Sequence, residues 1–164
     1  MSLYLDKQKL YEDYVKELNS FRDYQMDLDE TRESFNFYIQ TDECTWKNIF
    51  DGKELVGFVI FGKGGGEVHP DADRGIAQAY VAPSHRRKGL MEDAVRDYAS
   101  RHRGIFSLLV IDGNTYAKRY WNNLFTKMNY EAVSLDSSCI IQPEGEHLEL
   151  LGYMPKAIIG EKFY

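Results

Sequence analysis

The chain is 164 residues long, which suits one domain with a single sizeable core. With 43% hydrophobic residues it is too apolar for a disordered chain, and its net charge of -6 argues against a nucleic-acid partner, because phosphate contacts require a basic face. No apolar run approaches the roughly 20 residues of a membrane-spanning helix and no secretory signal is recognisable, so we expect a cytoplasmic protein without a membrane partner.

The cysteines and histidines predict neither a metal site nor a disulfide. Cys44 and Cys139 form no close pair and have no histidine at ligand spacing, so we expect buried thiols. No two histidines lie four residues apart, as two metal ligands on one helix face would. They stand at positions 69, 85, 102 and 147; His85 could assist anion binding, although exposure to solvent is favoured.

The amino-terminal part predicts two helices followed by a β-hairpin. Apolar residues at three- and four-residue spacing predict an amphipathic helix over residues 6–22. Residues 35–39 fit a helix at one spacing and a strand at another, and we slightly favour the helix. The apolar segments 45–50 and 55–62 flank Asp51-Gly52-Lys53, and an Asp-Gly between two such runs indicates antiparallel strands.

The remainder alternates strands with helices. A glycine- and charge-rich span, residues 63–74, leads into these elements, and the continuous apolar run at 105–111 is typical of a strand buried on both faces. The predicted elements are a strand at 75–81, a helix at 89–103, a strand at 105–111, a helix with apolar residues from 117 to 128, and strands at 130–135 and 147–154.

The most informative segment is AYVAPSHRRKGLM at positions 79–91, where a strand ends, turns and enters a helix through Arg86, Arg87, Lys88 and Gly89. The first turn of a helix has unpaired N–H groups and about half a positive charge. A glycine there lets an anion approach the backbone closely. The arrangement therefore suits a diphosphate, which the basic side chains can also attract.

This segment resembles the signature of the GNAT N-acetyltransferase family, which reads strand-Val-x-Pro-x-x-Arg-x-x-Gly-x-Gly/Ala-helix. Arg86 and Gly89 occupy the leading positions, whereas Met91 replaces the final Gly or Ala. The family also places an Asn after the next strand and an Ala three residues later, and Asn114 and Ala117 have that spacing. The similarity extends over roughly residues 55–130.

The resemblance implies a single GNAT-like domain over residues 1–164. Its fold class would be α/β (α+β), with a mixed, mostly antiparallel sheet flanked by about four helices. At the centre of that sheet, the strands at 75–81 and 105–111 would form a splayed parallel pair that holds the coenzyme.

The resemblance also implies acetyl-coenzyme A as co-substrate. Backbone groups of Tyr80, Val81 and Ala82 would hold the pantetheine arm, and Asn114 would contact the coenzyme. The diphosphate would be bound by Arg86, Arg87, Lys88, Gly89, Leu90 and Met91.

Transfer of an acetyl group to an amine requires the neutral amine, and deprotonating a lysine-like amine at pH 7 costs roughly 4 to 5 kcal/mol. The family often uses a strand Glu as base and a helix Tyr as acid. Here Gln78 stands where the carboxylate is expected, so a water relay would replace it. Glu67, His69, Asp71 and Asp73 could complete such a relay, although a solvated acidic loop is favoured.

The acid is ambiguous because two counts along the helix differ by about one turn. Counting back from the helix end puts Phe125 at the family's Tyr position, and counting forward from Asn114 puts Trp121 there. Neither has a proton to give. The candidate acids are therefore the neighbouring Tyr120 and Tyr116.

We predict an N-acetyltransferase that acts on a primary amine of a small molecule or peptide, as a monomer or homodimer. One alternative is a non-catalytic module of the same fold that binds coenzyme A or an acyl-coenzyme A as a regulatory ligand. A second is an interaction domain that binds no nucleotide because Met91 closes the cleft. The glycine-rich run at 62–66 lacks the Lys-Ser/Thr pair and helix start of a nucleotide loop.

Overall fold

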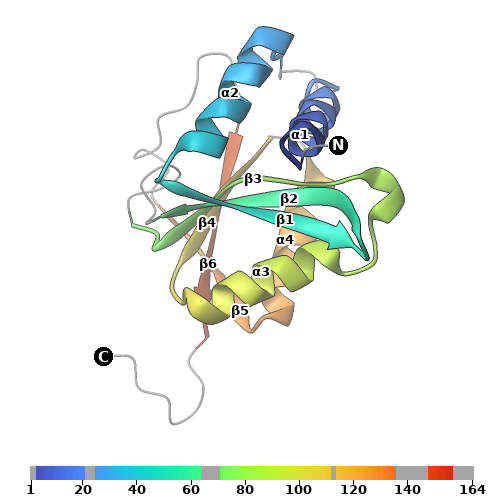
Figure 1. The fold of residues 1–164 in the computed structure, drawn as a ribbon. Helices are drawn as coiled ribbons and strands as arrows, with labels where there is room; N and C mark the ends of the chain where they lie inside the picture. Colours follow the sequence, from blue (N-terminus) through green and yellow to red (C-terminus); the bar gives the residue numbers. More distant parts are fainter. Residues whose placement is uncertain (1–2, 21–24, 64–70, 112–113, 136–147, 157–164) are drawn as a thin grey trace.

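A single mixed sheet organises the chain (Figure 1). The computed structural model describes residues 3–20, 25–63, 71–111, 114–135 and 148–156. Within them a six-stranded sheet has the order β1-β2-β3-β4-β6-β5, and only β3 and β4 are parallel neighbours. The strands are β1 (Cys44–Asp51), β2 (Glu54–Lys63), β3 (Arg74–Val81), β4 (Phe106–Ile111), β5 (Tyr130–Val133) and β6 (Leu148–Pro155).

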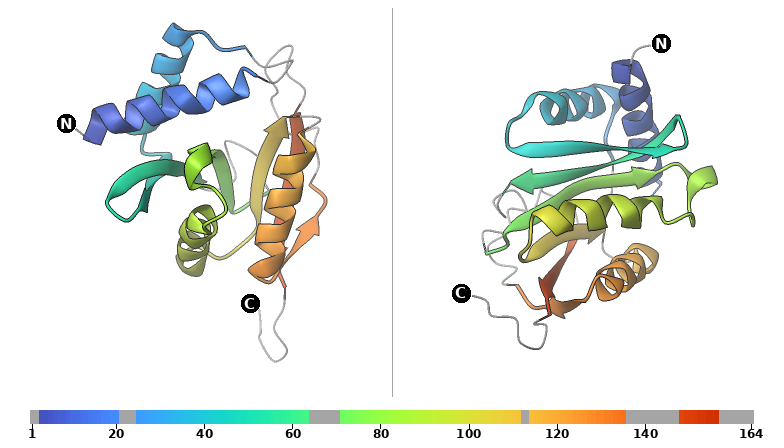
Figure 2. Two further views of the ribbon diagram at one scale, coloured as in Figure 1. Left: turned by 90° about the vertical axis from the view of Figure 1, so that its right-hand side faces the viewer. Right: turned by 60° about the horizontal axis from the view of Figure 1, so that its bottom comes forward.

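Helices cover both faces of this sheet, with α1 and α2 on one face and α3 and α4 on the other (Figures 1 and 2). In the described part of the chain, none of them combines the length and the apolar character that a membrane crossing needs. α1 begins and ends earlier than the predicted 6–22. The helices are α1 (Leu3–Leu18), α2 (Leu28–Gln40), α3 (Leu90–Arg101) and α4 (Thr115–Lys127), with a 3-10 turn at Pro83–His85.

The predicted order of elements is confirmed, and the ambiguous segment at 35–39 is helical. The side chain of Asp27 accepts a hydrogen bond from the Glu30 backbone N–H, and the Glu30 side chain accepts one from the Asp27 N–H. This reciprocal capping box fixes the start of α2. Phe35 and Tyr38, three residues apart, then both face the core, as helical spacing requires.

β2 contributes to two separate cores. Val59 and Phe61 pack in a cluster that α3 and α4 complete, whereas Phe58 and Ile60 pack in a cluster with Tyr11 of α1. All four strand residues are fully buried. Successive side chains of a strand point to opposite faces, so a continuous apolar strand must be covered on both sides.

β3 and β4 pair over only three residues each, and the pairing ends at Ile76 and Leu108. Directly beyond this point, the register between β2 and β3 skips Ala77, which is therefore a β-bulge. A bulge bends a strand and increases its twist. β3 consequently turns away from β4, and the two halves of the sheet diverge (Figure 2). This is the predicted splayed parallel pair.

In the described part of the structure, the core clusters cover the end of β4 on one face only. Leu108 and Val110 pack in the cluster of α3 and α4, whereas Leu109 and Ile111, on the opposite face, are half-buried and belong to neither core cluster. The expectation that this strand is buried on both faces is therefore wrong for its last residues. The physical reason is that α1 and α2 pack over β1 and β2 and leave this end uncovered by them.

Phe125 anchors α4 to the second half of the sheet. Its fully buried ring stacks on Tyr153 of β6 with the ring centroids 4.3 Å apart, and lies 5.6 Å from the ring of Phe106 on β4. The ring therefore connects α4 to β4 and β6, on the side of the sheet that diverges from β3.

Replacing Phe125 by alanine is expected to lower the free energy of unfolding by about 3–5 kcal/mol, because a buried cavity replaces the stacked ring. Phe50, which is 46% exposed on β1, is the matched control, and the same change there should cost less than about 1 kcal/mol. Urea denaturation of both variants measures the difference. Equal losses would contradict the anchoring role.

Candidate active site

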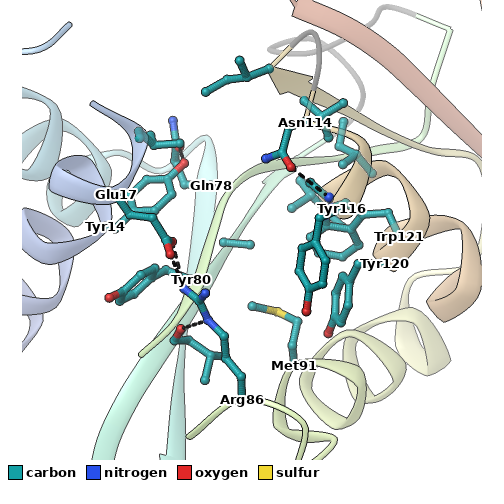
Figure 3. A pocket seen from close by; sticks show the side chains of 18 of the residues that line it. Tyr14, Glu17, Gln78, Tyr80, Arg86, Met91, Asn114, Tyr116, Tyr120 and Trp121 are labelled. Atoms are coloured by element: carbon teal, nitrogen blue, oxygen red, sulfur yellow. Dashed lines mark hydrogen bonds and ion pairs between the residues drawn. The ribbon is translucent and has the colours of Figure 1, made fainter. Parts of the chain in front are cut away.

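A cleft of about 740 Å³ lies where β3 and β4 diverge. Figure 3 shows its two walls: Tyr14, Glu17, Gln78, Tyr80 and Arg86 on one side, facing Met91, Asn114, Tyr116, Tyr120 and Trp121 on the other. The lining residues come mainly from α1, β3, the loop before α3, the start of α3, β4, α4 and β6. Segments that are distant in the sequence therefore meet at one opening in the sheet.

The α3 entry loop, residues 82–89, ends at an uncapped helix start. Gly89 is the N-cap of α3 with φ 75°, and no side chain caps it, whereas α2 and α4 begin with the capping side chains of Asp27 and Asn114. A Cβ built on Gly89 would meet no atom within 4 Å. The first-turn N–H groups of α3 thus face open space at the edge of the cleft, as an anion site requires.

The basic side chains of this loop are mostly held by carboxylates of the same chain. Arg86 binds both oxygens of Glu17 at 2.8 and 2.9 Å. Lys88 Nζ lies 2.7 Å and His85 Nδ1 2.9 Å from the same Asp51 oxygen, and their hydrogen bonds lower the pKa of Asp51. Attraction of an anion here therefore depends mainly on the backbone.

Arg87 is the exception in this loop. Its side chain is exposed and forms no ion pair with any residue that the structure describes. Its φ of 65° lies in the left-handed region, which is uncommon for a residue with a side chain. Such backbone strain is found at ligand-binding sites, where the surrounding structure holds it.

The end of β3 directs main-chain groups into the cleft. Val81 lies opposite Gly57 of β2, and the next residue, Ala82, donates its N–H to β2 at 2.8 Å. Bonded and non-bonded pairs alternate in an antiparallel ladder, so the N–H and carbonyl of Val81 point away from β2. The carbonyl accepts a hydrogen bond from Arg86 Nε at 2.8 Å. Tyr80, by contrast, is bonded towards β2 and presents its ring to α1.

Met91 and Leu90 lie in the first turn of α3 and line the cleft. Met91 is buried and packs in the core cluster of α3 and α4, although the family signature has Gly or Ala there. Its side chain lines one wall of the cleft, but the cleft and the space at Gly89 stay open. The alternative of an interaction domain that binds no nucleotide required Met91 to close the cleft, and Met91 does not close it.

Asn114 explains the spacing noted in the sequence. Its side-chain oxygen accepts a hydrogen bond from the Ala117 N–H at 3.1 Å and caps α4. The cap fixes the start of the helix whose next residues line the cleft, and it leaves the amide group of Asn114 on the cleft wall (Figure 3).

Tyr116 and Tyr120 lie one turn apart on this wall (Figure 3). Tyr116 is 58% exposed. Burial, together with Glu92 and Tyr116, raises the pKa of Tyr120 to about 12, so its phenol stays protonated at neutral pH. Trp121 lines the cleft as well, whereas Phe125 is fully buried outside it. Of the two positions predicted for the family's tyrosine, the one counted forward from Asn114, Trp121, therefore lies in the cleft, whereas Phe125 does not.

Gln78 is fixed on the opposite wall by two tyrosines. Its side-chain oxygen accepts a hydrogen bond from the Tyr14 hydroxyl, and its amide nitrogen donates to the Tyr38 hydroxyl at 3.3 Å. Asp73 does not reach this group, because it accepts the Ile105 N–H at 2.7 Å at the other end of β3. Residues 64–70, which include Glu67 and His69, lie outside the described residues, as do Cys139 and His147.

Tyr14 and Glu17 of α1 are cleft residues that the sequence reasoning missed. Their helix was predicted, but no local motif indicates which distant strand a helix will cover. The available signal was their three-residue spacing, which places both on one helix face.

Residues 7–125 match the acetyltransferase (GNAT) family. This match covers most of the chain, so the protein belongs to the GNAT acetyltransferase family. No curated protein sequence matches the chain.

Solved structures with the same fold include an acetyltransferase from Thermus thermophilus (16% identity, TM-score 0.61, covering 93% of this chain and 91% of that one). Diaminobutyrate acetyltransferase from Paenibacillus lautus, in complex with L-2,4-diaminobutyric acid and coenzyme A, has 17% identity and a TM-score of 0.59, with 93% and 90% covered. Spermidine N-acetyltransferase from Vibrio cholerae, with coenzyme A and spermine, has 16% identity and a TM-score of 0.54, with 91% and 88% covered.

Replacing Asn114 by alanine is expected to lower the free energy of unfolding by about 0.5–2 kcal/mol, because the α4 cap is lost. Aspartate at this position should retain the cap and most of the stability. Asn123→Ala, at an exposed position of the same helix, is the control and should cost nothing measurable. Thermal denaturation compares the three variants, and equal melting temperatures for Asn114→Ala and wild type would contradict the capping role.

Proposed function

We propose that the protein transfers an acetyl group from acetyl-coenzyme A to a primary amine of a small molecule or peptide. The observation that supports this most directly is the uncapped start of α3 at Gly89, directly after a strand that has separated from its parallel neighbour. The first feature suits a diphosphate and the second suits an extended amide-bearing arm.

The chain offers suitable groups to each part of the coenzyme. Backbone N–H groups of Gly89, Leu90 and Met91 would bind the diphosphate, with Arg87 as the available cation. Main-chain groups at the end of β3 would hold the pantetheine amides. Of the three predicted residues, Tyr80, Val81 and Ala82, it is Val81 whose main-chain groups point into the cleft, because Tyr80 and Ala82 are bonded towards β2. The amide of Asn114 would contact the coenzyme from the facing wall. Arg86 and Lys88, which are engaged by carboxylates, would act mainly by shaping the loop.

In the proposed reaction the neutral amine attacks the thioester carbonyl carbon, forming a carbon–nitrogen bond. The carbon–sulfur bond breaks, the sulfur leaves as a thiolate, and the nitrogen loses its proton. Tyr120, whose pKa is raised to about 12, would donate a hydrogen bond to the departing sulfur, and Tyr116 is the second candidate. A thiol ionises near pH 8.5, so this donation assists a leaving group that is already stable.

The proton of the amine requires an acceptor, and Gln78 cannot provide one at neutral pH. We propose that it passes to water on the α1 side of the cleft. Gln78, held by Tyr14 and Tyr38, would orient the amine rather than deprotonate it.

The named acceptors of two structural neighbours, diaminobutyric acid and spermidine, support an amine as the acceptor. The non-catalytic alternative, a module that only binds coenzyme A, is favoured by one observation, the substitution of Gln78 for a carboxylate. Thiol release from acetyl-coenzyme A across a panel of amines separates the two functions. Coenzyme A binding without turnover above buffer hydrolysis would establish the non-catalytic one.

Gly89→Val is expected to weaken coenzyme A binding at least about tenfold, because a β-branched residue disfavours φ 75° and its side chain enters the anion site. Lys88→Ala, which removes a side chain bound to Asp51, should weaken it less than about threefold. Isothermal titration calorimetry measures both. Equal tolerance would indicate that side chains, not backbone amides, hold the diphosphate.

Tyr120→Phe is expected to lower kcat by up to about a hundredfold while the KM for acetyl-coenzyme A changes little, because only the proton donor is lost. Since the pKa of Tyr120 is raised to about 12, the wild-type rate should show no loss from its ionisation up to pH 9. Tyr116→Phe is the comparison and should have the smaller effect. An unchanged kcat for Tyr120→Phe would exclude it as the acid.

A further inference from the structure

The cleft has two sides, because alternate residues of a strand point to opposite faces of the sheet. Ala79 and Val81 point to the side of α3 and α4, towards the groups assigned to the coenzyme. Gln78 and Tyr80 point to the side of α1, where both contact Tyr14. The α1 side therefore remains for the acceptor.

Three half-buried apolar side chains form the floor of the α1 side. Leu109 and Ile111 lie two residues apart on β4 and share a face, and Leu148 of β6 is directly opposite Ile111. All three line the cleft, and none belongs to either core cluster. We call these three residues the apolar floor. It offers an apolar surface on which an apolar ligand could be buried, outside both core clusters of the described residues.

Among the described residues that line this side of the cleft, the negative charge is one carboxylate, which is held in an ion pair. The described lining residues include two carboxylates, and Glu92 lies on α3, where it binds Arg96 at 3.2 Å. Glu17 alone is on the α1 side, and both its oxygens bind Arg86. An ammonium group placed on the apolar floor would lose water without gaining a carboxylate from the described lining residues, which is strongly unfavourable.

We propose that the acceptor is an amine with a single positive charge and an apolar body, an inference that rests on the proposed function. Its amine end lies at Gln78, and its body lies on the apolar floor. Gln78 is suited to this because Tyr14 and Tyr38 fix its amide group in one orientation. Diamines and polyamines, whose second charge would reach the floor, are disfavoured.

Two amines of equal length test this proposal, n-hexylamine and 1,6-diaminohexane. Calorimetry on the protein saturated with coenzyme A should show the monoamine binding at least about tenfold more tightly, because only the diamine places an ammonium on the apolar floor. Shortening the monoamine to n-butylamine should weaken binding by about fourfold for each methylene removed.

Substitutions on the floor should change this preference. Leu109→Asp adds a carboxylate and is expected to reverse the order of the two amines, whereas Leu28→Asp, an exposed position on α2 outside the cleft, should leave it unchanged. Leu109→Ala provides a second variant without a new charge. It should weaken n-hexylamine binding and leave the diamine nearly unaffected.

The same titrations on the protein without coenzyme A separate the two proposals. Absence of coenzyme A binding would contradict the proposed function, while the titrations without coenzyme A would still measure which amine binds more tightly. Diamine binding as tight as monoamine binding, in a protein that takes up coenzyme A, would overturn the acceptor inference alone.

Discussion

The separation of β3 from β4 is the constraint on which the rest of the site depends. Backbone N–H and carbonyl groups must be paired or solvated, and a parallel ladder normally pairs them along its whole length. Here the bulge at Ala77 ends the ladder after Ile76 and Leu108. The main-chain groups of Val81 are consequently directed at an opening rather than at a neighbouring strand. A ligand that carries its own amides can pair with them, which is how a sheet irregularity becomes a binding site.

α1 connects two parts of one wall of this opening. Tyr14 binds Gln78 on β3, and three residues later Glu17 binds Arg86 on the α3 entry loop. Arg86 in turn binds the Val81 carbonyl and lies 5.6 Å from the Tyr80 ring centroid. The helix is therefore tied both to the strand that would orient an acceptor and to the loop that would hold a diphosphate. A change in position of that loop would be transmitted to α1 through one guanidinium group.

Much of this architecture could be predicted from local sequence. The hairpin around Gly52, the helix start near Gly89 and the order of elements all follow from short-range rules of turns, caps and periodicity. Contacts between distant segments could not be predicted in this way. Nothing near Glu17 indicates that it meets Arg86, and the apolar run that ends at Ile111 does not reveal that α1 and α2 leave one of its faces uncovered. Sequence patterns report a residue's own element, whereas the site is made by packing between elements.

The central claim is that main-chain amides at the start of α3 bind the diphosphate of coenzyme A. Amide chemical shifts in ¹⁵N-labelled protein test it most directly, by comparing coenzyme A with pantetheine, which lacks the diphosphate. The account predicts that coenzyme A shifts the amide signals of Gly89, Leu90 and Met91 and that pantetheine does not. Coenzyme A binding that leaves these three signals unmoved would contradict it.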